Sequence, residues 1–196
     1  MVEPGFETED PAIDVYIHTG DASEDEAVAK LLEELDAEEV IKRTLLAVHV
    51  QQPVMLTLMI TGNEEIQTLN RQYRQQDKPT DVLSFPLLDE PLVEAPAEWL
   101  WQSANEEEVD VELPQETRPV FITPDELLTN LGDIAISWPT VQQQASEAGH
   151  DAAYELLFLL SHGVLHLVGY DDQTEAGYAE MVRVQNAVLA SLKQDN

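Results

Sequence analysis

Residues 154–168 read Tyr-Glu-Leu-Leu-Phe-Leu-Leu-Ser-His-Gly-Val-Leu-His-Leu-Val and are apolar on nearly every face of a helix. A helix of this composition packs inside the core of a protein. His162 and His166 are four residues apart, so their imidazoles lie one turn apart on the same face. Buried polar groups without partners cost on the order of 1 to 3 kcal/mol each, and a shared divalent cation would satisfy both rings. The pattern therefore predicts a metal site.

The residues that follow this helix strengthen the metal hypothesis. Gly169 ends the helix and permits a sharp reversal of the chain. Asp171 and Asp172 then arrive where a third ligand could turn back toward the histidines. Two histidines and one carboxylate leave one position of the ion open, which is typical of a catalytic zinc site. The spacing alone does not choose between the two aspartates.

A peptidase is a competing hypothesis for such a site. Metalloproteases of the His-Glu-x-x-His type place a glutamate directly after the first histidine, where it acts as general base. Gly163 occupies that position here, and the neighbouring sequence offers no substitute glutamate. The metal site is thus predicted without the base that a peptidase needs.

The rest of the chain alternates predicted strands and helices. Apolar alternation and β-branched residues predict strands over 13–19, 54–60, 81–85 and 132–137. Helices are predicted over 23–46 (in one piece or two), 64–74, 139–149, 151–168 and 174–193, with Thr174 as an N-cap. This order predicts an α+β fold, in which a small mixed sheet packs against several helices and the metal site lies at the end of a buried helix.

The length of 196 residues fits one domain. Residues 1–12 are predicted to form an acidic, disordered tail, and 13–196 a single domain. An acidic insertion rich in proline interrupts it at about 88–119. Trp99 and Trp101 in this insertion are expected to dock it on the body, although they could stack on bases. Asp81 and Ser137 are expected to be structural, and His150 is a reserve candidate beside the metal helix.

The charge of the chain is strongly acidic, with 9 basic and 39 acidic residues and a formal net charge of −30. Such a chain repels nucleic acid and anionic membranes at long range. The acids are unevenly distributed, because residues 1–39 and 90–118 together hold 23 of them. Arg71, Arg74 and Lys78 are a third of all the cations and fall within eight residues. We therefore expect a local cationic patch that can bind phosphate.

Other classes of protein are disfavoured by composition. The chain has no cysteine, which excludes disulfides and thiolate metal sites. No stretch reaches the ~18 to 20 apolar residues of a membrane span, and the acidic start is unlike a secretory signal. The expectation is a cytoplasmic protein with no membrane partner.

Three segments resemble the YbeY family of bacterial ribosomal RNA maturation factors and metal-dependent endoribonucleases. They are residues 161–172 (Ser-His-Gly-Val-Leu-His-Leu-Val-Gly-Tyr-Asp-Asp), 69–86 (Leu-Asn-Arg-Gln-Tyr-Arg-Gln-Gln-Asp-Lys-Pro-Thr-Asp-Val-Leu-Ser-Phe-Pro) and 131–134 (Leu-Gly-Asp-Ile). The resemblance implies an enzyme that cuts single-stranded RNA, with a role in 3′-end maturation of small-subunit ribosomal RNA and in ribosome quality control. Its implied partners are that RNA and the ribosome or small-subunit proteins.

The resemblance also assigns site residues. It implies that one divalent metal per chain is held by His162, His166 and Asp172, where the family usually has a third histidine. Zinc is the expected metal, and the carboxylate of Asp172 makes manganese or magnesium possible. Arg74 matches the functional arginine of the family and is the expected catalytic residue, with Arg71 and Lys78 beside it for RNA binding. The alternative is a ribosome-assembly factor without catalytic activity, in which the metal is structural.

Overall fold

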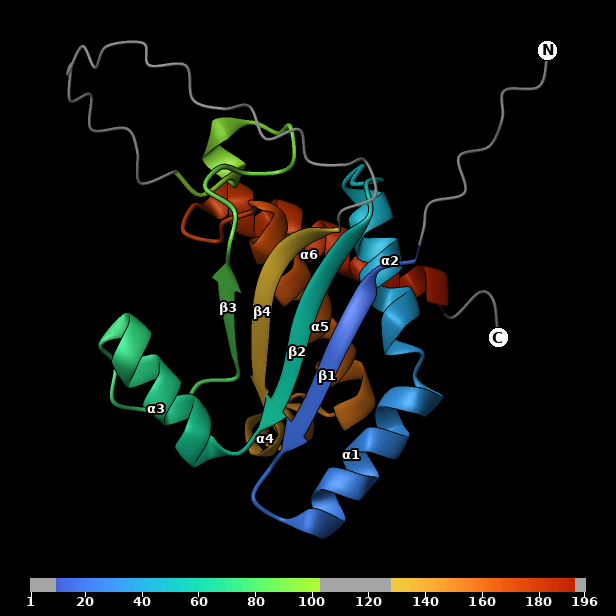
Figure 1. The fold of residues 1–196 in the computed structure, drawn as a ribbon, viewed down its shortest axis with the longest axis vertical. Coiled ribbons are helices and arrows are strands. Elements are labelled where there is room, and N and C mark those ends of the chain that lie inside the picture. Colours follow the sequence, from blue (N-terminus) through green and yellow to red (C-terminus); the bar gives the residue numbers. More distant parts are fainter. Residues whose placement is uncertain (1–9, 103–127, 193–196) are drawn as a thin grey trace.

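The computed structural model describes residues 10–102 and 128–192. Its elements are β1 (Ala12–His18), α1 (Ala22–Glu34), α2 (Ala37–Ala47), β2 (Val54–Thr61), α3 (Asn63–Arg74), β3 (Val82–Pro86), the short 3-10 helix η1 (Ala97–Trp99), β4 (Thr129–Ser137), α4 (Trp138–Ala148), α5 (Ala152–Val168) and α6 (Glu175–Leu192) (Figure 1). Every strand and helix predicted from the sequence is present in this order.

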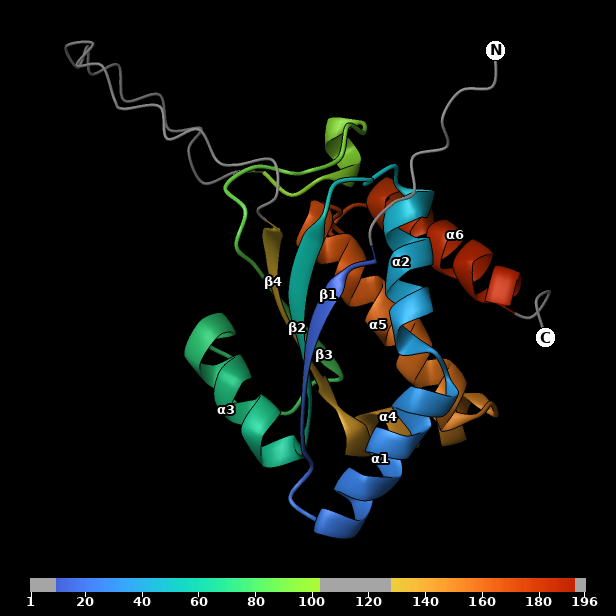
Figure 2. The same cartoon turned by 45° about the vertical axis from the view of Figure 1, so that its right-hand side comes forward.

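The four strands form one mixed sheet in the order β1-β2-β4-β3. Strands β1, β2 and β4 are parallel to one another, whereas β3 runs antiparallel to β4. Helix α3 lies alone on one face of the sheet, and α1, α2, α5 and α6 lie on the other (Figure 2). The predicted class, a small mixed sheet packed against several helices, is confirmed.

Helix α5 forms the centre of the thick layer. Its fully buried side chains include Leu156, Leu160, Val164 and Leu165. They belong to one apolar cluster with side chains of β2, β4, α2 and α6. Because α5 is covered on these sides, its polar side chains that line a pocket, Glu155, His162 and His166, lie on one stripe of the helix.

Local capping explains where several elements begin. The helical stretch predicted over 23–46 is broken at Asp36, which has a left-handed φ of 50° and accepts a hydrogen bond from the Glu39 N–H at 3.2 Å. Ser137 caps α4 by accepting from the Thr140 N–H at 3.4 Å. The predicted N-cap at Thr174 is confirmed, since its Oγ1 accepts from the Gly177 N–H at 2.9 Å. Strand β4 begins at Thr129, three residues before the predicted start.

The first part of the predicted insertion packs closely on the body. The Leu92 N–H donates to the Val168 carbonyl at 2.9 Å, and the Trp101 N–H donates to the Gly169 carbonyl at 2.9 Å. The Trp101 indole also donates to the carbonyl of His166 at 3.2 Å. The docking expected of the tryptophans is therefore observed. The predicted tail is outside the described residues up to residue 9, and so is the insertion from residue 103 to 119.

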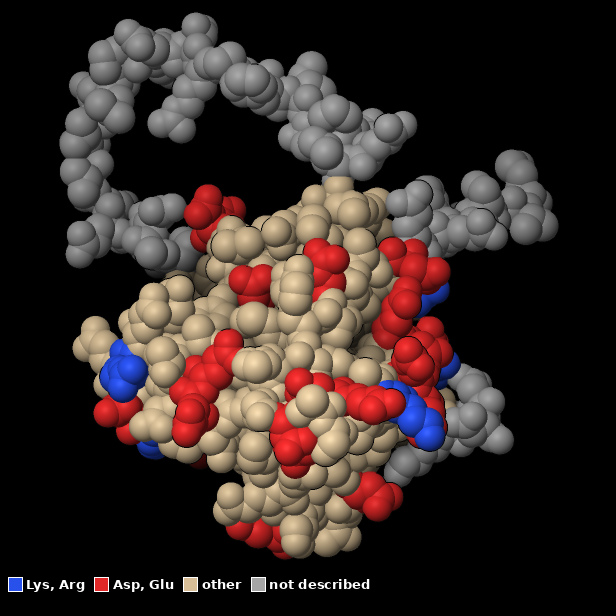
Figure 3. Space-filling view, turned by 60° about the horizontal axis from the view of Figure 1, so that its bottom comes forward, with Lys and Arg blue, Asp and Glu red and all other residues tan. Residues whose placement is uncertain are grey.

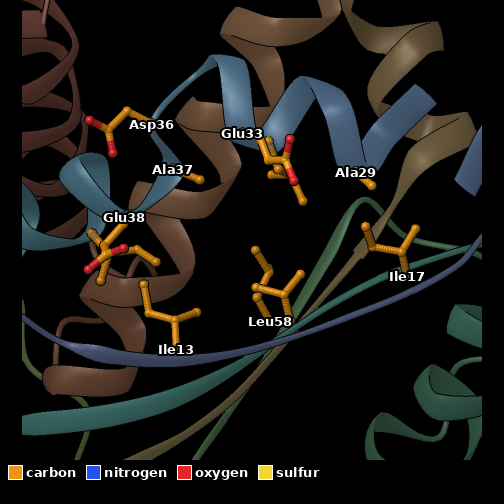
Figure 4. A pocket seen from close by; sticks show the side chains of 11 residues that line it. Ile13, Ile17, Ala29, Glu33, Asp36, Ala37, Glu38 and Leu58 are labelled. Carbon is orange, nitrogen blue, oxygen red and sulfur yellow. The ribbon is translucent and has the colours of Figure 1, made fainter. Parts of the chain in front are cut away.

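A crevice of about 470 Å³ lies between β1, α1 and α2 (Figure 4). Ile13, Ile17 and Leu58 form its apolar floor, and Glu33 with its acidic neighbours on α1 and α2 forms the rim. It shares no residue with the pocket that contains the two histidines of α5. Within the described part of the chain, no single helix is long and apolar enough to cross a membrane.

Gly163 sets the distance between α5 and the sheet. A Cβ atom built at this position would lie 2.8 Å from Cγ2 and 2.9 Å from Cδ1 of Ile134 on β4. Ile134 is fully buried, so it has little room to move. The glutamate of a His-Glu-x-x-His peptidase could not occupy this position without displacing β4.

We predict that Gly163→Ala lowers the free energy of unfolding by about 1 kcal/mol. Overpacking typically destabilises a core by ~1 to 3 kcal/mol, and the higher helix propensity of alanine offsets about 1 kcal/mol of this loss. In an Ile134→Ala background the same substitution should be neutral or stabilising, because the clash is absent. Urea unfolding of the four proteins in this double-mutant cycle measures both effects. An equal loss in the two backgrounds would contradict the assigned contact.

Candidate active site

The last turns of α5 bring the rings of His162 and His166 together in a nearly perpendicular, edge-on arrangement, with an interplanar angle of 84°. Their Nε2 atoms are 3.0 Å apart, and Oδ2 of Asp172 is 3.9 Å from Nε2 of His162. One potential ligand atom from each of the three residues falls within 4.8 Å of the others. The structure therefore brings together the three residues that were predicted to bind metal.

The turn after α5 places the third residue. Gly169 has a φ of 126°, a backbone conformation that residues with a side chain rarely adopt. A Cβ atom at this position would also lie 2.5 Å from Cβ of Pro91. The Tyr170 N–H then donates to the Leu165 carbonyl at 2.9 Å, and the chain reverses. Asp172 turns toward the histidines, whereas Oδ1 of Asp171 accepts a hydrogen bond from the backbone of the following turn. The geometry thus favours Asp172 over Asp171 as the third ligand.

The contact of its outer ring nitrogen assigns the tautomer of His166. Nδ1 of His166 is 2.9 Å from the Tyr170 carbonyl oxygen, which can only accept, so this nitrogen carries the proton. In the neutral ring, Nε2 of His166 is therefore unprotonated, and its lone pair faces Nε2 of His162 at 3.0 Å. The side chain of Gln185 is the hydrogen-bonding neighbour of His162, and this contact acts to raise the pKa of that ring, against the larger effect of burial.

Burial keeps these two rings neutral. It lowers the pKa of His162 to about 4, with a further contribution from the neighbouring His166, while Asp172 acts in the opposite direction. Burial also lowers the pKa of His166. Neutral imidazoles are the form that binds metal. The unprotonated Nε2 of His166 lies 3.0 Å from Nε2 of His162, so one ion can be reached from both rings.

The donor set fits one divalent ion. Imidazole nitrogens and carboxylate oxygens bind zinc at about 2.0 to 2.2 Å, so two ligands on one tetrahedral ion lie ~3.3 to 3.6 Å apart. The separations of 3.0 and 3.9 Å bracket this range. The side chain of Asp172 is 43% exposed, so one side of the group is accessible to water and substrate. The three residues could hold a metal and leave a coordination position open.

The metal group lies in a pocket of about 340 Å³. Besides the three candidate ligands, its lining comes from α3, β3, α4, α5 and α6: Arg74, Asp81, Val82, Ser84, Gln144, Glu155, Phe158, Leu159, Tyr178, Val182 and Gln185. Arg74 and the three candidate ligands lie toward the C-terminal end of α5, whereas Glu155 lies near the N-terminal end of this helix.

Of the three predicted cations, the structure brings only Arg74 into this pocket. Arg74 ends α3, is exposed, and lies near enough to His166 for its charge to lower the pKa of that ring. It makes no ion pair with another described residue. Arg71 instead pairs with Asp77 at 3.4 Å, and neither Arg71 nor Lys78 lines the pocket.

Several pocket residues were missed by the sequence analysis. Gln185 is fully buried on α6, and its Nε2 donates to the Phe158 carbonyl at 3.1 Å. A glutamine on the buried face of an amphipathic helix was the signal that could have identified it. Glu155 lies seven residues before His162, a spacing that places both on one face of α5. Asp81, expected to be structural, both caps the start of β3 and lines the pocket.

We predict that Gln185→Leu weakens metal binding by about 10- to 100-fold, the usual cost of losing a partner that orients a metal-binding histidine. Gln185→Glu keeps an acceptor for the His162 ring and should retain most of the affinity. Competition with a chelator measures the dissociation constants. Asn186→Ala, at an exposed neighbouring position, is the matched control and should bind as the unmodified protein does. Equal affinity of the leucine variant would show that Gln185 does not orient His162.

Comparisons of the sequence with a family model and with individual proteins identify the same family. The family model of endoribonuclease YbeY matches residues 19–193. The endoribonuclease YbeY of Dehalococcoides mccartyi is 38% identical over 165 residues, which cover 84% of this chain and 91% of that protein. The endoribonuclease YbeY of Acetivibrio thermocellus is 36% identical over 156 residues, which cover 79% of this chain and 83% of that protein.

A solved structure is also similar. The solution structure of a protein from Thermotoga maritima superimposes with a TM-score of 0.51 at 25% sequence identity. The match covers 92% of this chain and 90% of that one. Fold and sequence therefore point to the same family.

Proposed function

The chain belongs to the family of YbeY endoribonucleases, and we propose that it hydrolyses phosphodiester bonds of single-stranded RNA in the pocket at the end of α5. The observation that carries this proposal is the meeting of two kinds of group in one pocket. His162, His166 and Asp172 can hold a divalent ion, and Arg74 from a distant helix lies at the same end. A metal next to an arginine is suited to a phosphate group.

The metal and the arginine have separate roles. When a divalent ion is bound by His162, His166 and Asp172, it supplies a Lewis acid and an activated water. Arg74, which has no competing carboxylate among the described residues, holds the scissile phosphate through its guanidinium fork and stabilises negative charge as it develops. Zinc is the proposed metal, since two of the three ligands are imidazoles. The carboxylate makes the site more tolerant of manganese or magnesium than one with three imidazoles.

RNA must approach this pocket against an unfavourable charge. On the face drawn in Figure 3, acidic side chains are scattered over the surface and basic ones lie at its margins. Long-range attraction cannot bring RNA to such a molecule. Binding is therefore local, with Arg74 at the reaction centre and Arg71 and Lys78 as additional phosphate contacts outside the pocket.

The proposed substrate is ribosomal RNA, in 3′-end maturation of the small subunit and in ribosome quality control, with the ribosome or small-subunit proteins as partners and the cytoplasm as compartment. The support is the family to which the chain belongs. The alternative is an assembly factor with a structural metal. A chelator separates the two, because it should abolish cleavage of single-stranded RNA by an enzyme, whereas an assembly factor has no cleavage to lose.

We predict that Asp172→Ala weakens metal binding at least about tenfold, because even outer partners of a metal ligand are worth ~10- to 100-fold. Asp172→His should bind zinc more tightly than the unmodified protein and discriminate more strongly against manganese. Elemental analysis measures the metal content of each variant, and competition with a chelator measures its dissociation constants for zinc and manganese. Asp171→Ala is the control. If Asp171→Ala loses the metal and Asp172→Ala keeps it, the third ligand is assigned to the wrong aspartate.

We predict that Arg74→Ala and Arg71→Ala separate chemistry from binding. Arg74→Ala should lower kcat for RNA cleavage by about 100-fold or more, the scale seen when one donor to a transition-state charge is removed. Arg71→Ala should leave kcat unchanged, raise KM, and reduce the salt dependence of RNA binding by about 0.7 in the slope of log affinity against log salt. Steady-state kinetics over a range of salt measures both. Unchanged kcat in Arg74→Ala would remove Arg74 from the reaction centre.

A further inference from the structure

The pocket continues along α5 well beyond the metal group. Glu155, His162 and His166 fall on one stripe of the helix and all line the pocket. Glu155 lies seven residues before His162, which places it about 10 Å farther along the axis at ~1.5 Å per residue. Asp81 from the start of β3 and Gln144 from α4 complete this far end. Glu155 is thus separated from the histidines along the helix axis, whereas the charge of Asp81 still acts on His162 and partly opposes the lowering of its pKa by burial.

The amide of Gln144 is fixed in one orientation. Its Nε2 donates to Oδ2 of Asp81 at 3.0 Å. The other carboxylate oxygen of Asp81 accepts from the Val82 N–H at 2.8 Å and from the Thr80 hydroxyl at 3.1 Å. Oε1 of Gln144 is buried and has no hydrogen-bond partner among the described residues. Buried acceptors without partners are rare in folded proteins, and this one belongs to a residue that lines a pocket.

Glu155 presents a second acceptor at the same end. Its side chain is only 13% exposed, and its Oε2 is 3.1 Å from Nε2 of His150. The second oxygen makes no hydrogen bond to any other described residue. Burial raises the pKa of Glu155, and the negative charge of Asp81 contributes in the same direction while His150 opposes it. The second oxygen of this partly buried carboxyl group is free to accept a hydrogen bond from a ligand that enters the pocket.

We propose that this far end is a base-binding subsite, which takes the Watson–Crick edge of a nucleobase that carries an amino group, with guanine preferred. The proposal rests on the proposed function, because it places the base of a nucleotide whose phosphate is held at the Arg74 end. Asp81, Gln144 and Glu155 offer acceptor oxygens to the ligand. A ligand that satisfies them must supply N–H donors.

The four bases differ in the donors that they supply. Guanine presents N1–H and the N2 amino group side by side, which match the unused oxygens of Gln144 and Glu155. Adenine and cytosine each present one amino group. Uracil presents a single N3–H between two carbonyl oxygens, and these would face the carboxylates of Asp81 and Glu155 unfavourably. The expected order is guanine first, adenine and cytosine next, and uracil last.

The polarity of the pocket fixes the direction of the nucleotide. The carboxylates of Asp81 and Glu155 repel a phosphate group, so the phosphate remains with Arg74 and the metal group. The ~10 Å between Glu155 and His162 along α5 is comparable to the reach from a backbone phosphate to the far edge of its own base. Phe158, Leu159 and Tyr178 also line the pocket. Apolar and aromatic side chains of this kind are suited to the faces of an unstacked base.

The test is a set of four short oligouridine RNAs that contain guanosine, adenosine, cytidine or uridine at one position. For the metal-loaded protein, we expect kcat/KM for cleavage at that position to be at least about tenfold higher for guanosine than for uridine, as a bidentate pair to a base provides. Gln144→Leu should remove most of this preference. Glu155→Gln exchanges an acceptor for a donor and should shift the preference toward uridine. Gln144→Glu keeps an acceptor and should keep the preference for guanosine.

The control is Gln143→Ala, which changes an exposed neighbour on α4 that hydrogen-bonds to Glu147 outside the pocket. Thermal unfolding establishes that each variant folds. Equal cleavage of the four RNAs by the unmodified protein overturns the subsite, since Gln144 then holds only water, and leaves the proposed function intact. A guanosine preference that survives both Gln144→Leu and Glu155→Gln also overturns it. If no RNA is cleaved, the proposed function fails, and equilibrium binding of the same four RNAs still decides the base preference.

Discussion

The close packing of α5 against β4 is the constraint on which the fold and the site both depend. Gly163 has no side chain, and this lets the helix approach the buried Ile134 directly. The approach closes the core around α5 on the side of the sheet, while α2 and α6 cover the other sides. His162 and His166 are thereby held in an environment that disfavours their charged forms. The packing that stabilises the fold therefore also keeps the two imidazoles in the neutral form that can bind a metal.

A second consequence of this packing is the division of the pocket into two chemically different ends. Helix α5 contributes histidines at its C-terminal end and Glu155 near its N-terminal end. Around these, α3 supplies a cation to the first end, and β3 with α4 supplies acceptors to the second. A flexible polymer with a charged phosphate and a polar base fits such a pocket in one direction only. The net charge of −30 opposes long-range attraction of a polyanion, so an RNA substrate must be held by contacts at short range, such as the one that Arg74 offers in the pocket.

Residues 88–102 form an acidic, proline-rich segment that nevertheless packs on the domain and supports the turn after α5. Its backbone pairs with the turn that follows α5, where the Asp171 N–H donates to the Trp99 carbonyl at 2.8 Å. The indole of Trp101 binds the carbonyl of His166 from the same side. These contacts support the turn that carries Asp172. The composition predicted an insertion because proline and acidic residues are common in loops. Main-chain hydrogen bonds do not depend on the type of side chain, so composition could not predict them.

The sequence by itself determined the elements and their order, because hydrophobic periodicity and capping residues act over a few neighbours. It also placed His162 and His166 on one face of a buried helix, since helical spacing alone does so. Tertiary structure decided which of two adjacent aspartates faces them, because that depends on the left-handed turn at Gly169 and its contact with Pro91. It likewise decided that Arg74 enters the pocket while Arg71 pairs with Asp77. Gln144, Glu155 and Gln185 come from three helices separated in the chain, so only folding could bring their polar atoms to one pocket.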